Sequence, residues 1–216
     1  MMSRWNAQLL LFDFDGTLID SKLDIATSVN LTLAELGLPQ RSLEEIYGFV
    51  GDGVKRLLRL SIGDEGEGRF EAALEIFRSH YLAHCVKTTK FYPGIAEVLR
   101  HYGGRKKAIV TNKSPEYTQC IVDGLGANSL FDAVVGARDV ADLKPEPAML
   151  HRILADLGED PDRTVMIGDS TNDVRAAQAA GVKACAVGYG YGNREKVLAL
   201  QPDFYCQRPE DLLNLF

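Results

Sequence analysis

The chain has 216 residues, of which 46% are hydrophobic and 25% are charged. This is the balance of a globular protein with a packed core, built as one large domain or as a core with a smaller second domain. A net charge of −6 predicts neither nucleic acid nor an anionic membrane surface as a partner. No apolar run approaches the ~20 residues of a membrane span.

Two features of the sequence indicate the cellular compartment of the protein. The first eight residues lack the apolar centre of a signal peptide. The four cysteines are far apart in the chain and form no CxxC pair: Cys85, Cys120, Cys185 and Cys206. We therefore expect reduced thiols and a cytoplasmic protein.

A short apolar run, residues 9–12, leads into the segment DFDGT at residues 13–17. Such a run, closed by a glycine turn, predicts a buried strand of a parallel sheet. Asp13 and Asp15 then point the same way, and a divalent cation would relieve their repulsion. Gly16 lets the backbone approach a ligand, and the N–H groups beside it can face an anion. The segment predicts a metal and anion site at the end of a strand, although an ordinary Asp-Gly turn remains the alternative.

The next part of the chain is helical throughout. Helices are predicted over 23–36, from the capping box at 42–45, over 54–60 and over 69–85. Asp20 and Ser21 are candidate caps for the first of them. Because no strand lies between these helices, we expect a helical cap domain over residues 21–90, inserted after strand one and able to cover its end.

From residue 91 the pattern alternates between strands and helices. Further strands are predicted over 107–111, 131–135, 164–167 and 183–187, and helices over 95–101, from Ser114, over 146–157, over 171–180, from Asn193 and from Pro209. Five short strands alternating with helices predict an α/β fold with a doubly wound parallel (Rossmann-like) sheet. Its core domain comprises residues 1–20 and 91–216.

Polar residues follow three of these later elements. Thr111 and Asn112 end the second strand and are able to hold phosphate oxygens. Lys144 precedes a proline that fixes the backbone, and a single fixed ammonium is what a phosphoryl-transfer site would need. Asp169 follows the fourth strand and would join Asp13 around Mg²⁺, with Asp173 one helical turn further on. Taken alone, the TN pair and Lys144 are better explained as a turn or cap and as a surface group, and one aspartate of the last cluster as a helix cap. Turn chemistry does not explain all of these clusters in sequence order.

The segments DFDGT, TNK, KP and GDSTND, in this order, resemble the four motifs of the haloacid dehalogenase superfamily of phosphohydrolases. The resemblance covers nearly the whole chain, and the helical insert is similar to the family's cap of the first type. It implies that Asp13 is the nucleophile and Asp15 the general acid and base. Thr111 and Lys144 would hold the transferring phosphoryl group, with Asn112 nearby.

The same resemblance implies a magnesium site. Asp13, the backbone carbonyl of Asp15, and Asp169 would bind Mg²⁺, and Asp173 would support them from behind. Dehalogenating members of the superfamily lack the second aspartate and need no metal. Because Asp15 is present, phosphoryl transfer is favoured over carbon–halogen cleavage.

The cap segment 48–54, GFVGDGV, is similar to the glycine-rich cap loop of phosphoglycolate phosphatases. Lys55 or Arg56 would then meet a substrate carboxylate, although a flexible turn with solvated basic residues is an equal alternative. The expected substrate is a small phosphorylated metabolite, 2-phosphoglycolate first. The alternatives are a sugar-phosphate mutase of the β-phosphoglucomutase type and a phosphatase for another metabolite such as pyrophosphate. We expect a monomer or a homodimer.

Overall fold

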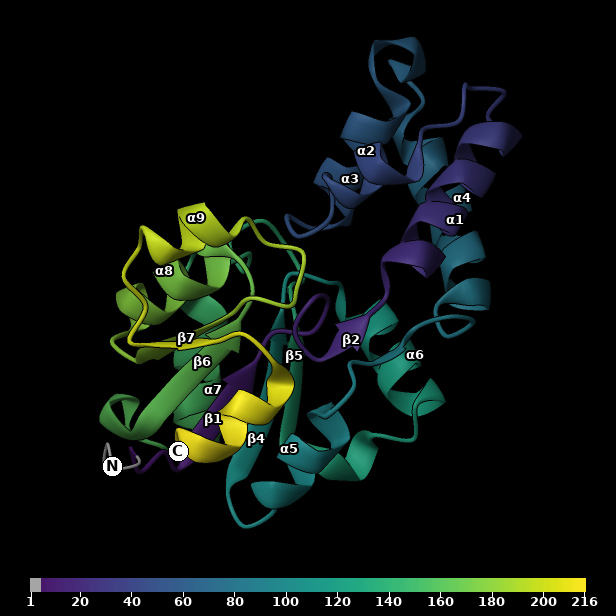
Figure 1. The fold of residues 1–216 in the computed structure, drawn as a ribbon. Helices are drawn as coiled ribbons and strands as arrows, with labels where there is room; N and C mark the ends of the chain where they lie inside the picture. Colours follow the sequence, from purple (N-terminus) through teal and green to yellow (C-terminus); the bar gives the residue numbers. More distant parts are fainter. Residues whose placement is uncertain (1–4) are drawn as a thin grey trace.

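The computed structural model describes residues 5–216 and is drawn in Figure 1. Residues 1–4 lie outside the described part. The predicted core segment 1–20 and the first eight residues of the chain both begin there. The ribbon has a larger lobe around a sheet and a smaller lobe of helices. In residues 5–216 no helix has both the length and the apolar character required to cross a membrane.

Within the described residues, six strands form one parallel sheet: β1 (Leu9–Phe12), β4 (Lys106–Thr111), β5 (Ala133–Gly136), β6 (Thr164–Gly168), β7 (Lys183–Val187) and β8 (Phe204–Cys206). Their order across the sheet is β5-β4-β1-β6-β7-β8, and every neighbouring pair is parallel. The doubly wound parallel sheet is therefore confirmed, with β1 in its centre. The predicted count of five strands was wrong, because β8 is a three-residue edge strand, too short for its pattern to be recognised.

Helices cover both faces of the sheet. They are α5 (Ile95–His101), α6 (Pro115–Gly124), α7 (Ala148–Leu157), α8 (Thr171–Ala180) and α9 (Arg194–Leu198), with the 3-10 segments η2 (Asn128–Leu130), η3 (Pro161–Arg163) and η4 (Pro209–Asn214). Two of these differ from expectation. α7 begins two residues later than predicted, because the N–H of Glu146 closes a turn on the carbonyl of Leu143. The helix predicted from Pro209 is a 3-10 segment.

Alternate residues of β1 enter two separate cores. Leu10 and Phe12 pack among side chains of α5, α6 and η4 on one face. Leu9 and Leu11 pack among those of α7 and α8 on the other. All four are completely buried, so the strand that precedes Asp13 is held from both sides.

The smaller lobe contains α1 (Lys22–Glu35), α2 (Leu43–Tyr47), α3 (Val54–Ile62), η1 (Asp64–Gly66) and α4 (Phe70–His84). Helix α4 packs against α1 and α3. Figure 1 shows these helices standing beyond the carboxyl ends of the central strands. The predicted capping box of α2 is present: the Ser42 hydroxyl accepts from the N–H of Glu45, whose carboxylate accepts from the N–H of Ser42.

Two short linkers join the lobes. Strand β2 (Ile19–Asp20) pairs antiparallel with β3 (Lys90–Phe91). Strands of two residues are too short for a sequence pattern to predict their pairing. Beside it, the buried carboxylate of Asp24 accepts hydrogen bonds from the N–H and hydroxyl groups of Thr88 and Thr89, at 2.7 to 3.1 Å. Burial works to raise the pKa of Asp24, but these bonds outweigh it and hold the pKa below its ordinary value.

We expect Asp24→Asn to lower the free energy of unfolding by about 2–3 kcal/mol. The reason is that an amide would turn its NH₂ group toward backbone N–H donors. Because the pKa of Asp24 is lowered on folding, its contribution is complete above about pH 4 and is lost as the pH falls through the folded-state pKa. Urea unfolding near neutral pH and at about pH 3 should therefore show a difference that shrinks in acid. Asp64→Asn, at an exposed aspartate, is the control, and equal losses in both variants would contradict this role.

Candidate active site

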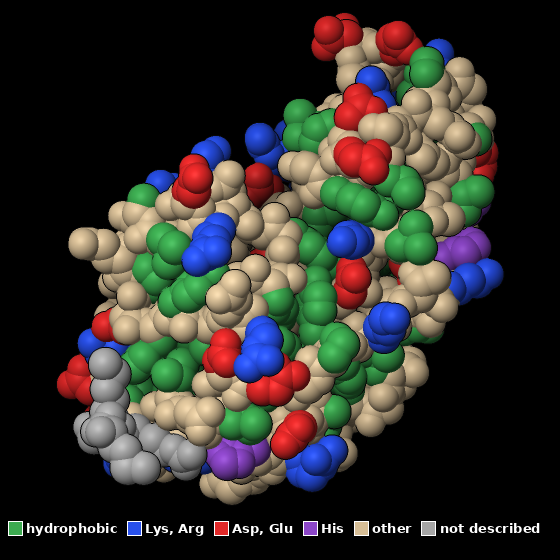
Figure 2. Space-filling view, viewed as in Figure 1, with side chains coloured by type: hydrophobic (Ala, Val, Ile, Leu, Met, Phe, Trp, Pro, Cys, Tyr) green, Lys and Arg blue, Asp and Glu red, His purple; other side chains and the backbone are tan. Residues whose placement is uncertain are grey.

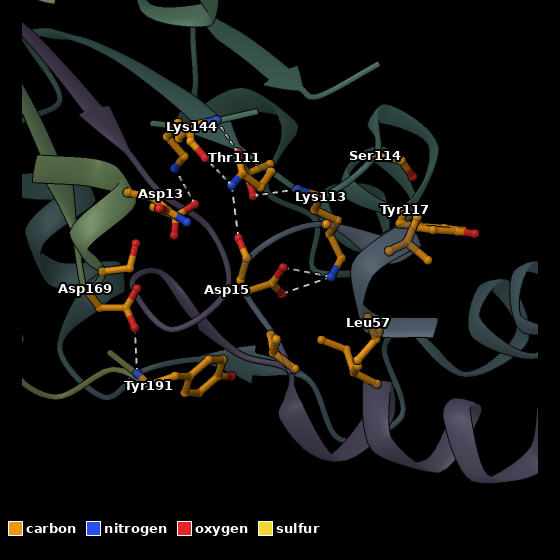
Figure 3. Close-up of a pocket in the computed structure, with 18 of the residues that line it drawn as sticks. Asp13, Asp15, Leu57, Thr111, Lys113, Ser114, Tyr117, Lys144, Asp169 and Tyr191 are labelled. Atoms are coloured by element: carbon orange, nitrogen blue, oxygen red, sulfur yellow. Dashed lines mark hydrogen bonds and ion pairs between the residues drawn. The ribbon is translucent and has the colours of Figure 1, made fainter. Parts of the chain in front are cut away.

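The carboxyl ends of three adjacent strands bring together the residues predicted from separate parts of the sequence. Asp13 follows β1, Thr111 ends β4, and Asp169 follows β6. Because β1 lies between β4 and β6, these side chains meet at one edge of the sheet (Figure 3). They line a cavity of about 120 Å³ together with Asp15, Asn112, Lys144 and Asp173.

Lys144 holds this group of residues together. Its ammonium nitrogen lies 2.8 Å from Asp13 Oδ1, 2.6 Å from Asp173 Oδ1 and 2.7 Å from the carbonyl oxygen of Val110. These three acceptors match its three N–H donors. The side chain is almost fully buried. Burial works to lower the pKa of Lys144, but the carboxylates of Asp13 and Asp173 outweigh it and raise the pKa, so the group is a permanent cation.

Two of the carboxylates on this cation, those of Asp13 and Asp173, form an acidic cluster with a third, that of Asp169. One oxygen from each of Asp13, Asp169 and Asp173 lies within 4.8 Å of the others. Burial raises the pKa of Asp13 to about 8, with Lys144 opposing and the other two carboxylates adding to the rise. Burial also raises the pKa of Asp169 to about 6, followed by the charge of Asp173. Negative charge is thus concentrated beyond what one lysine balances, which is the condition that a bound cation relieves.

Asp169 is fixed by a loop that follows β7. Its Oδ2 accepts from the backbone N–H groups of Tyr191 at 2.6 Å and Gly192 at 2.9 Å. The Tyr191 hydroxyl accepts from the N–H groups of Ser21 and Lys22, at the start of α1. Sequence analysis did not predict these contacts, because nothing in a Tyr-Gly loop indicates which carboxylate its backbone faces.

Asn112 lies where predicted but contacts the protein. Its Oδ1 accepts from the N–H of Lys144 at 2.7 Å, and its Nδ2 donates to the carbonyl oxygen of Lys144 at 3.0 Å. The same Nδ2 donates to the carbonyl oxygen of Gly51, in the cap, at 3.0 Å. Asn112 therefore positions the backbone of Lys144 and links it to the cap loop.

Asp15 faces away from the three-carboxylate cluster. Its carboxylate accepts from the ammonium of Lys113 at 2.8 and 3.0 Å and, by a short bond, from the hydroxyl of Ser21. That bond explains why Ser21, the N-cap residue of α1, makes no side-chain cap bond. Sequence reasoning missed Lys113, although it directly follows the TN pair.

The structure does not bring Arg56 into the cavity. Arg56 lies on the neighbouring surface hollow, pairs with Asp52 at 3.0 Å, and is 61% exposed. Gly16 does not line the cavity either. Its own N–H donates to the carbonyl oxygen of Ile19 within the turn, and a side chain added at this position would meet Asp169.

From the cap, the cavity is lined by apolar side chains. They are Ile25, Val50, Val54, Leu57 and Phe77. The glycines of the predicted cap loop, Gly51 and Gly53, line it as well.

On the face drawn in Figure 2 acidic and basic side chains are interspersed, so the concentration of charge inside the cavity has no counterpart on that face.

A parallel sheet whose central strand ends in a carboxylate, held by a buried lysine beside an acidic cluster, is the arrangement of an α/β enzyme with its site at the carboxyl ends of the strands. The sequence profile of the haloacid dehalogenase-like hydrolases matches residues 10–187. The chain belongs to that family.

The chain also matches named relatives over nearly its whole length. It is 38% identical over 210 residues to a phosphoglycolate phosphatase of Aquifex aeolicus, covering 96% of each chain. It is 35% identical over 215 residues to a phosphoglycolate phosphatase of Colwellia psychrerythraea, covering 95% of each. A crystal structure of a predicted phosphoglycolate phosphatase from Haemophilus somnus 129pt aligns with a TM-score of 0.89 at 28% identity, covering 99% of this chain and 98% of that one.

We expect Gly16→Ala to reduce hydrolase activity by about 10²-fold, a loss typical of misplacing a group by about 1 Å. A β-carbon at this position would lie 2.6 Å from Asp169 Oδ2 and displace that carboxylate. Gly181→Ala is the matched control, because both glycines have positive φ but a β-carbon at Gly181 meets nothing within 4 Å. Both variants should lose about 1–2 kcal/mol of stability. Full activity in Gly16→Ala would contradict the close packing against Asp169.

Proposed function

We propose that this chain is a Mg²⁺-dependent phosphatase that hydrolyses a small phosphomonoester through an aspartyl-phosphate, with 2-phosphoglycolate as its substrate. The single observation that carries the proposal is the acidic cluster of Asp13, Asp169 and Asp173, which lines a small cavity and is joined by the Lys144 ammonium through Asp13 and Asp173. The names of the relatives support the phosphatase activity and the substrate.

In the first half of the reaction, the oxygen of Asp13 that Lys144 does not bind attacks the phosphorus atom. An aspartyl oxygen–phosphorus bond forms as the ester oxygen–phosphorus bond breaks, and Asp15 gives a proton to the leaving alkoxide. In the second half, the Asp15 carboxylate takes a proton from a water molecule whose oxygen attacks the same phosphorus. The bond to Asp13 then breaks and phosphate leaves.

The other residues at the sheet edge stabilise the transferring group. Lys144 keeps Asp13 in place and supplies positive charge near the phosphoryl oxygens. Thr111 presents a buried hydroxyl at the end of β4, where it donates to one of those oxygens. Asn112 acts through Lys144, whose backbone it holds.

The acidic cluster fits Mg²⁺ in its chemistry, since hard oxygen ligands are what this ion prefers. Asp13, Asp169 and the backbone carbonyl of Asp15 would hold it, and Asp173 would support them through Lys144. When bound, the ion neutralises charge on the phosphoryl oxygens. Burial, together with the charges of neighbouring carboxylates, raises the pKa of Asp13 and of Asp169, and this supports the assignment because a bound cation would stabilise their charged forms.

We propose that residues 1–20 and 91–216 act as the core domain and residues 21–90 as the cap. The core supplies the charged groups of the cavity, and the cap supplies most of its apolar wall. We therefore assign the chemistry to the core and the selection of the leaving group to the cap. We further propose a cytoplasmic location, where the four free thiols would stay reduced.

We expect Asp13→Asn to lower phosphate release by more than about 10³-fold, because an amide oxygen is not a nucleophile at phosphorus. Phosphate release would be measured across a panel of phosphorylated metabolites, with Mg²⁺ and with a chelator. Asp156→Asn, at an exposed aspartate, should keep wild-type activity. Release that survives in Asp13→Asn or in chelator would overturn the mechanism, and an isomerised sugar phosphate in place of free phosphate would indicate a mutase.

We expect Mg²⁺ binding to weaken as the pH falls from about 8 to about 6, since a carboxylate must lose its proton before it binds the ion. The pKa of about 8 for Asp13 and about 6 for Asp169 place this change in that window. Calorimetric titration in two buffers of different ionisation enthalpy should show protons released on binding. An affinity that is constant across the window, with no proton release, would contradict the raised pKa values.

A further inference from the structure

The mechanism leaves one buried cation without a task. Lys113 follows the TN pair, lines the cavity, and has a side chain that is 6% exposed. Its ammonium lies 2.8 and 3.0 Å from the two oxygens of Asp15 (Figure 3). Burying a lysine is costly unless it is paired, and here its partner is the proposed general acid.

Among the described residues that line the cavity, Lys113 and Lys144 are the only lysines or arginines. Lys144 has all three donors occupied by protein acceptors. Lys113 instead directs its ammonium at a single carboxylate and at the ring face of Tyr81, 4.8 Å from the ring centroid. Its contacts therefore leave donor capacity on the side of the cavity that Asp15 occupies.

The second unusual group is the hydroxyl of Tyr81, on α4 of the cap. Tyr81 is 1% exposed and lines the cavity, but its hydroxyl has no hydrogen-bond partner among the described residues. Burial raises the pKa of Tyr81 well above its ordinary value, with the charge of Asp15 as the next cause, so the hydroxyl keeps its proton. An unpaired buried hydroxyl is costly, and an acceptor atom on a ligand would satisfy it.

Around these two groups the cap wall is apolar, with Ile25, Leu57 and Phe77. An anionic group on the substrate would pay a large desolvation penalty against such a wall unless it met a cation and a donor. In 2-phosphoglycolate the carboxylate carbon is two bonds from the leaving oxygen, which Asp15 protonates. A cation that sits on Asp15 is therefore within reach of that carboxylate.

We propose that the Lys113 ammonium and the Tyr81 hydroxyl form the subsite for the carboxylate of a phosphorylated 2-hydroxy acid. The proposal rests on the proposed function and deepens it. Lys113 comes from the core and Tyr81 from the cap, so the carboxylate joins the two domains when it binds. This subsite takes the place that sequence analysis gave to Lys55 or Arg56.

The test compares 2-phosphoglycolate with ethyl phosphate, which has a methyl group in place of the carboxylate. For each enzyme the quantity is the ratio of kcat/KM for the two compounds. Lys113 also holds Asp15, so Lys113→Met will slow both reactions, but the ratio cancels that shared effect. Tyr81→Phe removes only a hydroxyl and keeps the test valid if Lys113→Met weakens the fold.

We expect the ratio to fall by about 10²-fold in Lys113→Met and by about 10-fold in Tyr81→Phe, mainly through a higher KM for 2-phosphoglycolate. Lys196→Met, at an exposed lysine of α9, should leave the ratio unchanged, and so should Arg56→Met.

The following outcomes would overturn the subsite or the proposed function. A wild-type ratio that persists in both Lys113→Met and Tyr81→Phe would overturn the subsite and leave the phosphatase intact. A ratio that falls only in Arg56→Met would restore the sequence expectation and likewise overturn the subsite. A wild-type enzyme that releases phosphate equally from both compounds would overturn the subsite together with 2-phosphoglycolate as substrate. No release from either would overturn the proposed function itself.

Discussion

The contact on which the rest of the site depends is that of the Lys144 ammonium with Asp13, Asp173 and the carbonyl of Val110. It joins residues from four separate parts of the chain at an edge where carboxylates would otherwise repel. A buried ion pair adds little net stability when its desolvation is counted, yet it is costly to break. The sheet provides the framework that makes such a contact possible, since β1 is packed on both faces and delivers Asp13 to a fixed point.

Hydrogen bonds of individual residues also connect the cap to the core. Asn112 touches both the backbone of Lys144 and the carbonyl of Gly51 in the cap loop. Tyr191 offers one backbone N–H to Asp169 and its hydroxyl to the start of α1. These hydrogen bonds can therefore transmit a shift of the cap to the lysine and to the acidic cluster. We infer that cap position and site geometry change together.

Sequence patterns could predict the fold and the acidic cluster because both depend on local signals. An apolar strand ending in DFDGT or GDSTND fixes where Asp13 and Asp169 lie, since parallel strands end at one edge. Lys113 and Tyr81 could not be found this way. A long side chain on a loop reaches in any direction, and a tyrosine at helical spacing with Phe77 looks like core. Only the packing of α4 over the sheet edge brings the Tyr81 ring against the Lys113 ammonium.

Charge balance ties these observations together. Among the described residues lining the cavity, four carboxylates face two ammonium groups, so the pocket by itself repels a phosphomonoester that carries a further carboxylate. A divalent cation in the acidic cluster would remove that excess on the side of the phosphoryl group. Such an ion would do little to stabilise the carboxylate at the other end of the substrate, because its electrostatic attraction falls with distance and with the groups that lie between them. A second anionic group therefore requires its own cation on the leaving-group side, and Lys113 is the lysine that the fold places there.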